Sequence, residues 1–252
     1  MSDEVTPPSR ALLALEARGL LELPAVLAAW PLLLGAPRGT RHSVLVLPGF
    51  GADDGSTRVI RSFLDQLGYE VHGWDRGRND RPPGSDLPDL QARVEALSRS
   101  SGLPVSLVGW SRGGIMAREL ARGAPDRVRL VVTLGSPFAA PQANNVGLIM
   151  RPSRRRPEFS PPSHPRTLLS PRPVPVPATS IYTRSDGVVA WRACLDEASE
   201  TAENVEVRTS HLGLGFHAPA LWVIADRLAQ PIGQWRPFRP PPLLRGLYPS
   251  LA

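Results

Sequence analysis

Lysine is absent from the 252-residue sequence, and cysteine occurs only once, as Cys194. A single cysteine excludes an internal disulfide, which favours a reducing compartment. The first residues also lack the positive region of a secretory signal, so we expect a cytoplasmic protein. All 29 basic residues are arginine, against 23 acidic ones, which gives a formal charge of +6. This balance suits an anionic surface, but no basic helix carries interleaved aromatic residues, and we expect no nucleic-acid partner.

Long apolar runs are also lacking. The most apolar early stretch, residues 23–36, is interrupted by Pro24 and Pro31 and is shorter than the ~20 residues that a membrane-spanning helix needs. Residues 1–37 therefore predict an apolar helical segment with two alternative roles. It packs on the core, or it docks on a lipid surface or covers the active site, which would make the protein membrane-associated. With one cysteine and no paired spacing of histidines, we expect no metal site and no cofactor.

From residue 43 onward, apolar runs of strand length alternate with helical patterns, as in a parallel sheet with crossover helices. The predicted strands cover residues 43–47, 70–74, 105–109, 128–134, 178–182 and 205–209. The predicted helices cover residues 57–67, 87–98, 112–122 and 218–228. Unbroken apolar strands suit a sheet covered on both faces. We therefore predict an α/β fold, with a mostly parallel central sheet and helices on both faces, as a single domain of residues 1–252.

Two proline-rich stretches break this alternation. Residues 141–177 hold ten prolines and six arginines with little periodic pattern, and such a segment is usually either a functional lid or disordered. We predict a lid-like insertion there, whose arginines either attract an anionic lipid or carboxylate substrate or form a solvated face. The tail, residues 231–252, is also rich in proline, which predicts an extended wrap along the surface.

A G-x-S-x-G motif, Gly109 to Gly113, lies between a predicted strand and a predicted helix. A serine on such a sharp turn projects its hydroxyl above the sheet, and the flanking glycines leave room for the strained backbone. The N-terminus of the following helix favours the negative charge that forms during attack on a carbonyl. The motif alone is a common accidental match, and a glycine-rich packing turn is the alternative. Its placement makes Ser111 the predicted nucleophile.

Four motifs carry a resemblance to a known family, namely LPGFG at residues 47–51, GWSRGG at 109–114, SDGVV at 185–189 and SHLGL at 210–214. Over about residues 43–228 the chain resembles the α/β-hydrolase superfamily, and more narrowly its lipase-like and esterase-like members. The resemblance implies that fold, acyl-transfer chemistry, and a triad in the order serine, acid, histidine.

The resemblance also implies an oxyanion hole of two backbone N–H groups. One follows the nucleophile, at Arg112, and the other belongs to an early loop, where Phe50 is the matching position. Pro48 replaces the histidine that is frequent in the family, but the donor is a main-chain group, so the chemistry survives the change. The alternative is a simple Pro-Gly turn.

Serine needs an adjacent base, and the base needs a third group that fixes its tautomer. The histidines that follow the nucleophile are His164, His211 and His217. His211 comes directly after the last predicted strand and is the expected base, with His217 as second choice. Asp186 lies in an Asp-Gly turn after the strand at residues 178–182 and is the expected acid. The alternative is a turn-forming aspartate without a partner.

These residues predict a carboxylic ester hydrolase of the lipase or esterase type, acting on a small-molecule or lipid ester through an acyl-enzyme. Two alternatives stay open. An acyltransferase or thioesterase would use the same chemistry, with a different nucleophile resolving the acyl-enzyme in the first case. A catalytically silent member would act as a binding protein or a chaperone, and the intact Ser111, Asp186 and His211 argue against it.

Overall fold

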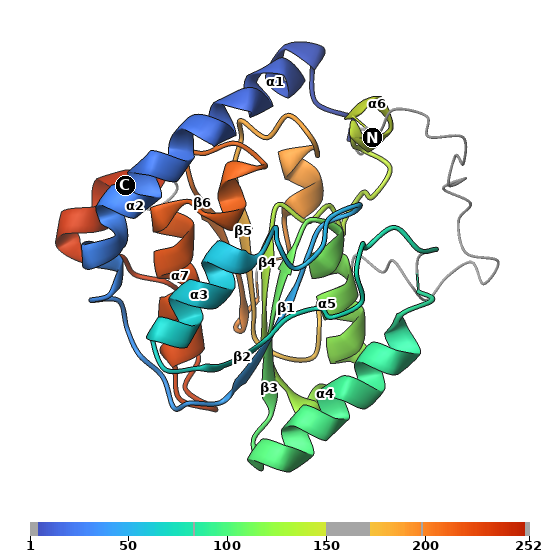
Figure 1. The fold of residues 1–252 in the computed structure, drawn as a ribbon, viewed down its shortest axis with the longest axis vertical. Helices are drawn as coiled ribbons and strands as arrows, with labels where there is room; N and C mark the ends of the chain where they lie inside the picture. Colours follow the sequence, from blue (N-terminus) through green and yellow to red (C-terminus); the bar gives the residue numbers. More distant parts are fainter. Residues whose placement is uncertain (1–4, 83, 150–171, 198, 250–252) are drawn as a thin grey trace.

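A six-stranded sheet forms the centre of the protein in the computed structural model, which describes residues 5–82, 84–149, 172–197 and 199–249 (Figure 1). The strands are β1 (Ser43–Leu47), β2 (Glu70–His72), β3 (Val105–Trp110), β4 (Val128–Leu134), β5 (Ala178–Tyr182) and β6 (Ala202–Glu206). They lie in the order β2-β1-β3-β4-β5-β6, and every neighbouring pair is parallel. The predicted parallel sheet is confirmed.

Helices cover both faces of this sheet. The α-helices are α1 (Arg10–Ala14), α2 (Gly19–Leu33), α3 (Arg58–Gln66), α4 (Leu87–Ser101), α5 (Arg112–Gly123), α6 (Val146–Ile149) and α7 (Ala218–Ala229). Short 3-10 helices are η1 (Leu15–Arg18), η2 (Pro125–Arg127), η3 (Trp191–Cys194), η4 (Gly213–Gly215) and η5 (Pro242–Leu247). α2, α3 and α7 pack on one face, and α4 and α5 pack on the other (Figure 1). The predicted α/β fold is confirmed.

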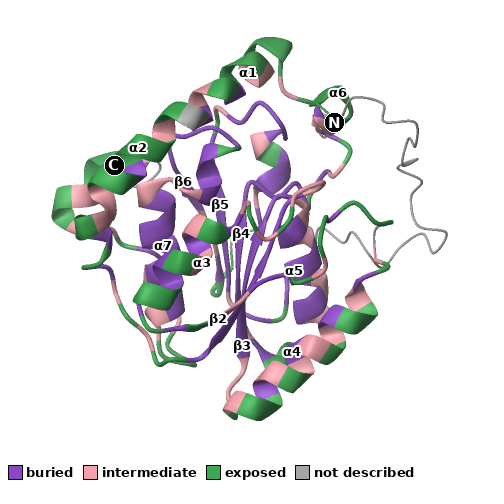
Figure 2. Ribbon diagram, viewed as in Figure 1, coloured by how far each residue is buried: buried purple, intermediate pink, exposed green. Residues whose placement is uncertain are grey.

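The first strand illustrates why both faces are covered. Val44 and Val46 belong to the core cluster of α2, α3 and α7, whereas Leu45 and Leu47 belong to the cluster of α4 and α5. Successive side chains of a strand point to opposite faces, so an unbroken apolar run needs a layer on each side. Burying each of these side chains contributes about 1.5–3 kcal/mol. Figure 2 shows the central strands buried and the outer sides of α2 and α4 exposed.

The last strand is displaced from its predicted position. The prediction of residues 205–209 is wrong, because β6 covers Ala202–Glu206. The valines near residue 206 favoured a later strand, but the carbonyl of Thr209 is bound by the hydroxyl of Thr183 at 2.9 Å, which draws the chain out of the sheet. This turn carries the chain over the end of β5. The other strand boundaries agree with prediction to within two residues.

The N-terminal apolar segment is helical in spite of its prolines. α2 runs through both Pro24 and Pro31, which interrupt the apolar run in the sequence but not the predicted helix. Val26 and Leu33 are buried in the core cluster that includes α7, and this packing outweighs the backbone hydrogen bonds that the prolines remove. The outward side of α2 exposes a row of leucines, Leu21, Leu23, Leu27 and Leu32. In the described ranges, no helix is both long and apolar enough to cross a bilayer.

Most of the predicted lid insertion, including His164 and the arginines from 151 to 166, lies outside the described residues. Its described start contains α6, and its described end leads into β5. The tail is held by aromatic side chains. Phe238 and Tyr248 are buried with ring centroids 4.9 Å apart, and the Tyr248 hydroxyl donates to the Pro219 carbonyl at 3.1 Å. The tail forms η5 before Tyr248, so the predicted extended wrap is wrong at that point.

Candidate active site

Ser111 occupies a tight bend between β3 and α5. Its φ of 54° lies in the left-handed region, which non-glycine residues rarely adopt and which tends to mark functional sites. Two flanking glycines make the bend possible. A Cβ atom on Gly109 would lie 2.4 Å from the Cα of Gly114, and one on Gly113 would lie 2.3 Å from the carbonyl oxygen of Leu47. Side chains at these positions would therefore push α5 away from the sheet.

The loops after β5 and β6 bring Asp186 and His211 together. His211 Nδ1 lies 2.6 Å from Oδ2 of Asp186, and both side chains are buried. The other carboxylate oxygen, Oδ1, accepts the N–H groups of Val188 at 2.8 Å and Val189 at 2.7 Å. The orientation of the carboxylate is therefore fixed. Because Asp186 accepts the proton on Nδ1, the Nε2 of His211 is left as the acceptor, which is the tautomer that a general base needs.

His211 also contacts the residue that precedes the serine. The indole N–H of Trp110 donates to the His211 carbonyl at 3.2 Å, and the two ring centroids are 6.3 Å apart. Beside the end of β4, a Cβ atom on Gly135 would lie 3.0 Å from Nδ1 of His211. Among the described residues no hydrogen bond joins Ser111 Oγ to the imidazole. Such contacts are often long before substrate binds and shorten in the reacting complex.

The two candidate bases differ in their electrostatics. Burial lowers the pKa of His211, but the charge and hydrogen bond of Asp186, together with the charge of Glu16, raise it, and the net effect is a pKa above that of a free imidazole. Burial lowers the pKa of His217 to about 4. His217 Nδ1 has no hydrogen-bond partner in the described part of the chain. The carboxylate thus pairs with the expected base and not with the second choice.

Both N–H groups expected in the oxyanion hole lie next to Ser111 along the chain or in space. Arg112 is the first residue of α5, where the helix dipole favours negative charge. The loop that holds Phe50 lies against the serine, since a Cβ atom on Gly49 would be 3.3 Å from the Ser111 Cβ. Within the described ranges, neither N–H group donates to a protein acceptor. Both are therefore available to a developing oxyanion.

Asn79 holds the Phe50 loop in place, a role that the sequence did not signal. Its side-chain amide donates to the Pro48 carbonyl at 2.8 Å. Its main chain accepts the N–H of Gly51 at 2.9 Å and donates to the carbonyl of Ala52 at 2.8 Å. Asn79 is fully buried. These bonds fix the loop on both sides of the Phe50 N–H group.

Three charged side chains of the N-terminal segment, Glu16, Arg18 and Glu22, bind the loops of Asp186 and His211. Sequence reasoning gave them no role. Their only signal was that they are the few charged residues beside an otherwise apolar stretch. The segment therefore packs on the core through Val26 and Leu33 and also binds these loops, while a role as a cover of the active site stays a prediction.

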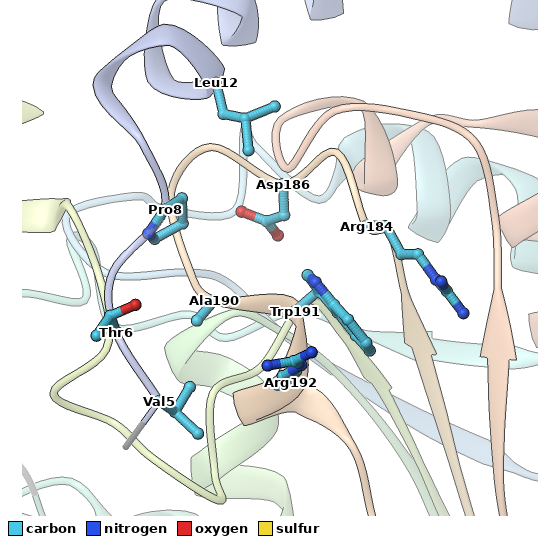
Figure 3. A pocket seen from close by; sticks show the side chains of 9 residues that line it. All are labelled: Val5, Thr6, Pro8, Leu12, Arg184, Asp186, Ala190, Trp191 and Arg192. Atoms are coloured by element: carbon cyan, nitrogen blue, oxygen red, sulfur yellow. The ribbon is translucent and has the colours of Figure 1, made fainter. Parts of the chain in front are cut away.

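A cavity of about 220 Å³ lies beside Asp186, between the N-terminal residues and η3 (Figure 3). Its walls include Leu12, Trp191 and two arginines, Arg184 and Arg192. Ser111 is not among the lining residues, so this cavity is not assigned to the acyl group. In the described part of the chain, no group of three or more potential metal ligands is present.

Comparisons with known proteins agree with a hydrolase fold. The alpha/beta hydrolase family profile matches residues 11–249. Serine hydrolase BPHL of Mus musculus is 32% identical over 106 residues, covering 38% of this chain and 36% of that protein. A pimeloyl-(acyl-carrier protein) methyl ester esterase of Neisseria meningitidis is 30% identical over 84 residues, covering 24% and 33%. The chain therefore matches about a third of the length of these curated relatives.

Solved structures support the fold alone, because their sequences are distant. The Bacillus licheniformis lipase BlEst2 has a TM-score of 0.57 at 14% identity, covering 77% of this chain and 94% of that chain. The pyrethroid hydrolase PytH has a TM-score of 0.53 at 18% identity, covering 77% and 100%. With a family profile that spans nearly all of its residues, the chain belongs to the alpha/beta hydrolase family.

Proposed function

We propose that this protein is a serine hydrolase that cleaves a carboxylic ester of the lipase or esterase type. Ser111 is the nucleophile, His211 the general base and Asp186 the acid that orients it. The observation that carries the proposal is the buried Asp186–His211 hydrogen bond of 2.6 Å, beside the strained bend of Ser111. An aspartate without a partner, or a serine in a relaxed packing turn, would not combine these features.

The proposed reaction has two half-reactions. Nε2 of His211 takes the Ser111 proton while Oγ attacks the ester carbonyl carbon, and the N–H groups of Phe50 and Arg112 donate to the oxyanion. Collapse breaks the bond to the alkoxy oxygen, which receives the proton from the imidazolium, and an acyl-serine remains. Water then repeats the sequence and releases the acid. Each oxyanion donor contributes a factor of about 10²–10³ to the rate.

The name of one relative, a methyl ester esterase, supports a carboxylic ester as substrate. Transfer of the acyl group to an alcohol acceptor, or thioester hydrolysis, would use the same residues. Turnover with esters of different acyl length, with and without an alcohol acceptor, and with matched thioesters distinguishes these reactions. A catalytically silent role would not require the paired Asp186 and His211.

Labelling with a fluorophosphonate, followed by peptide mapping, tests the nucleophile and the reaction class together. We expect one label, on Ser111, and hydrolysis of short p-nitrophenyl esters by the wild type. Ser111→Ala should lose both activities and keep the circular dichroism spectrum of the wild type. Retained turnover in that variant, or a label on another residue, would remove the assignment.

Contact with an anionic lipid surface and a cytoplasmic location both stay predictions. The first is supported by the exposed leucines of α2, with Leu21 79% and Leu27 70% exposed, and by the formal charge of +6. Co-sedimentation with phosphatidylglycerol vesicles is expected to fall when both leucines are replaced by serine. Equal binding of that variant would contradict it. Cell fractionation tests the location.

A further inference from the structure

One buried carboxylate outside the proposed triad joins the loop of the acid to the loop of the base. Oε1 of Glu16 accepts the N–H of Gly187 at 2.7 Å and the N–H of His211 at 3.0 Å. Oε2 accepts the N–H of Leu212 at 3.0 Å. Gly187 directly follows Asp186. A single side chain of η1, 5% exposed, therefore binds the backbone of both loops.

Two more side chains of the same segment bind these loops. Arg18 donates to the carbonyl of Ser185 at 3.0 Å and to that of Thr209 at 3.1 Å. Glu22 accepts the hydroxyl of Thr209 and the N–H of Ser210, the latter at 3.3 Å. We call the three side chains the N-terminal clamp: Glu16, Arg18 and Glu22.

Two glycines of these loops, Gly187 and Gly213, lie directly against the N-terminal segment. A Cβ atom on Gly187 would lie 2.3 Å from the carbonyl oxygen of Leu12. One on Gly213 would lie 2.0 Å from a carboxylate oxygen of Glu22. A side chain at position 187 would therefore collide with the backbone of the N-terminal segment, and one at position 213 would displace the Glu22 carboxylate. The Asp186 loop lies directly below α1 in Figure 3.

Glu16 also acts on the base through its charge. The charged groups around His211 are Asp186, which binds the imidazole, and the clamp, which binds the surrounding backbone. Asp186 and Glu16 both raise the pKa of His211 against the effect of burial. Glu16 therefore acts on His211 without a hydrogen bond to its ring, through the main chain and through its electric field.

We propose that Glu16 is a positioning residue, whose carboxylate holds the loops of Asp186 and His211 at the separation that the reaction needs. This inference rests on the proposed function of Ser111. The N-terminal segment would then contribute to activity without supplying a reacting atom. A loss of its carboxylate should misplace the base rather than the substrate.

Two substitutions separate the position of the carboxylate from its charge. Glu16→Gln removes the charge and presents an amide N–H₂ to backbone donors, so one of the three N–H groups loses its acceptor. We expect kcat to fall about 10- to 100-fold, because small displacements of a catalytic group have effects of this size, with KM nearly unchanged. The acidic limb of the pH profile of kcat/KM should move to lower pH.

Glu16→Asp keeps the charge on a side chain that is shorter by one methylene. It should lower kcat as well, because it cannot reach both loops, but leave the acidic limb closer to that of the wild type. Glu95→Gln is the matched control, since Glu95 is partly exposed on α4, where it faces Arg99 at 3.8 Å, on the other side of the sheet. Glu95→Gln should change neither kcat nor the position of the acidic limb. A purely structural role would reduce the folded fraction of both Glu16 variants but leave the kcat of the folded molecules unchanged.

A folded Glu16→Gln variant with kcat within twofold of the wild type and an unmoved acidic limb would overturn the proposal. If the variant does not fold, amide hydrogen exchange of the wild type decides. The N–H groups of Gly187, His211 and Leu212 are then expected to exchange slowly and together, and exchange at the rates of free loop amides would overturn it. Fluorophosphonate labelling of the wild type tests the proposed function separately, because a failure to label leaves the exchange result unaffected.

Discussion

Hydrogen bonds fix the orientation of the Asp186 carboxylate, so the effect of replacing it by asparagine on His211 can be predicted. Oδ1 accepts two main-chain N–H groups, those of Val188 and Val189. In Asp186→Asn, only the amide oxygen can satisfy those donors, so the amide N–H₂ must face Nδ1 of His211. Nδ1 then becomes the acceptor and the proton moves to Nε2. The base would carry a proton where it needs a lone pair.

The size of the effect follows from that tautomer. A base of the wrong tautomer, with the fold intact, is expected to lower kcat about 10⁴-fold. This corresponds to about 5 kcal/mol in the activation free energy. KM should change little, since the substituted atom does not contact the substrate. The acidic limb should also shift to lower pH, because Asp186 no longer raises the pKa of His211.

Steady-state hydrolysis of a p-nitrophenyl ester measures this prediction, with circular dichroism as the check on folding. Asp65→Asn, on the exposed side of α3, is the matched control and should retain wild-type kcat. A folded Asp186→Asn variant with kcat within tenfold of the wild type would refute the reasoning, because the two fixed N–H donors would not then control the imidazole.

Three further predictions follow from other contacts. The rate constant kcat/KM should fall as the pH drops through the raised pKa of His211, because His211 must be neutral to accept the serine proton. A midpoint below that of a free imidazole would contradict this. Asn79→Ala should lower kcat about 100-fold by releasing the oxyanion loop, as measured with the same ester, and an unchanged kcat would exclude that role. Gly113→Ala places a methyl group 2.3 Å from the Leu47 carbonyl oxygen and should lower Tm by several degrees, at about 2–4 °C per kcal/mol. Gly147→Ala, whose methyl group meets no atom of the described residues within 4 Å, should not lower Tm.

The sheet could be predicted because its signal is local. An unbroken apolar run such as residues 43–47 is compatible with few structures other than a strand covered on both faces, and β1 has those bounds. The end of the last strand could not be predicted in this way. It depends on the hydroxyl of Thr183, which lies 26 residues before Thr209. A contact of this kind leaves no periodic pattern in the sequence.

In the candidate site too, residues with a local sequence signal could be predicted and residues without one could not. Asp186 and His211 were expected from their turns after predicted strands, and their hydrogen bond joins two loops that both lie where strands end. Glu16 and Asn79 were missed, because each acts on main-chain atoms far away in sequence. The helical segment near the N-terminus was expected in spite of Pro24 and Pro31, and burial of one side of α2 outweighs their local preference.

The most direct test of the proposed chemistry is a crystal structure of the fluorophosphonate adduct. We expect the phosphorus on Ser111 Oγ, a phosphoryl oxygen about 2.7–3.1 Å from the N–H nitrogens of Phe50 and Arg112, and Nε2 of His211 within hydrogen-bonding reach of Oγ. An adduct on another residue, or an imidazole turned away from Oγ with no other base beside it, would contradict the account.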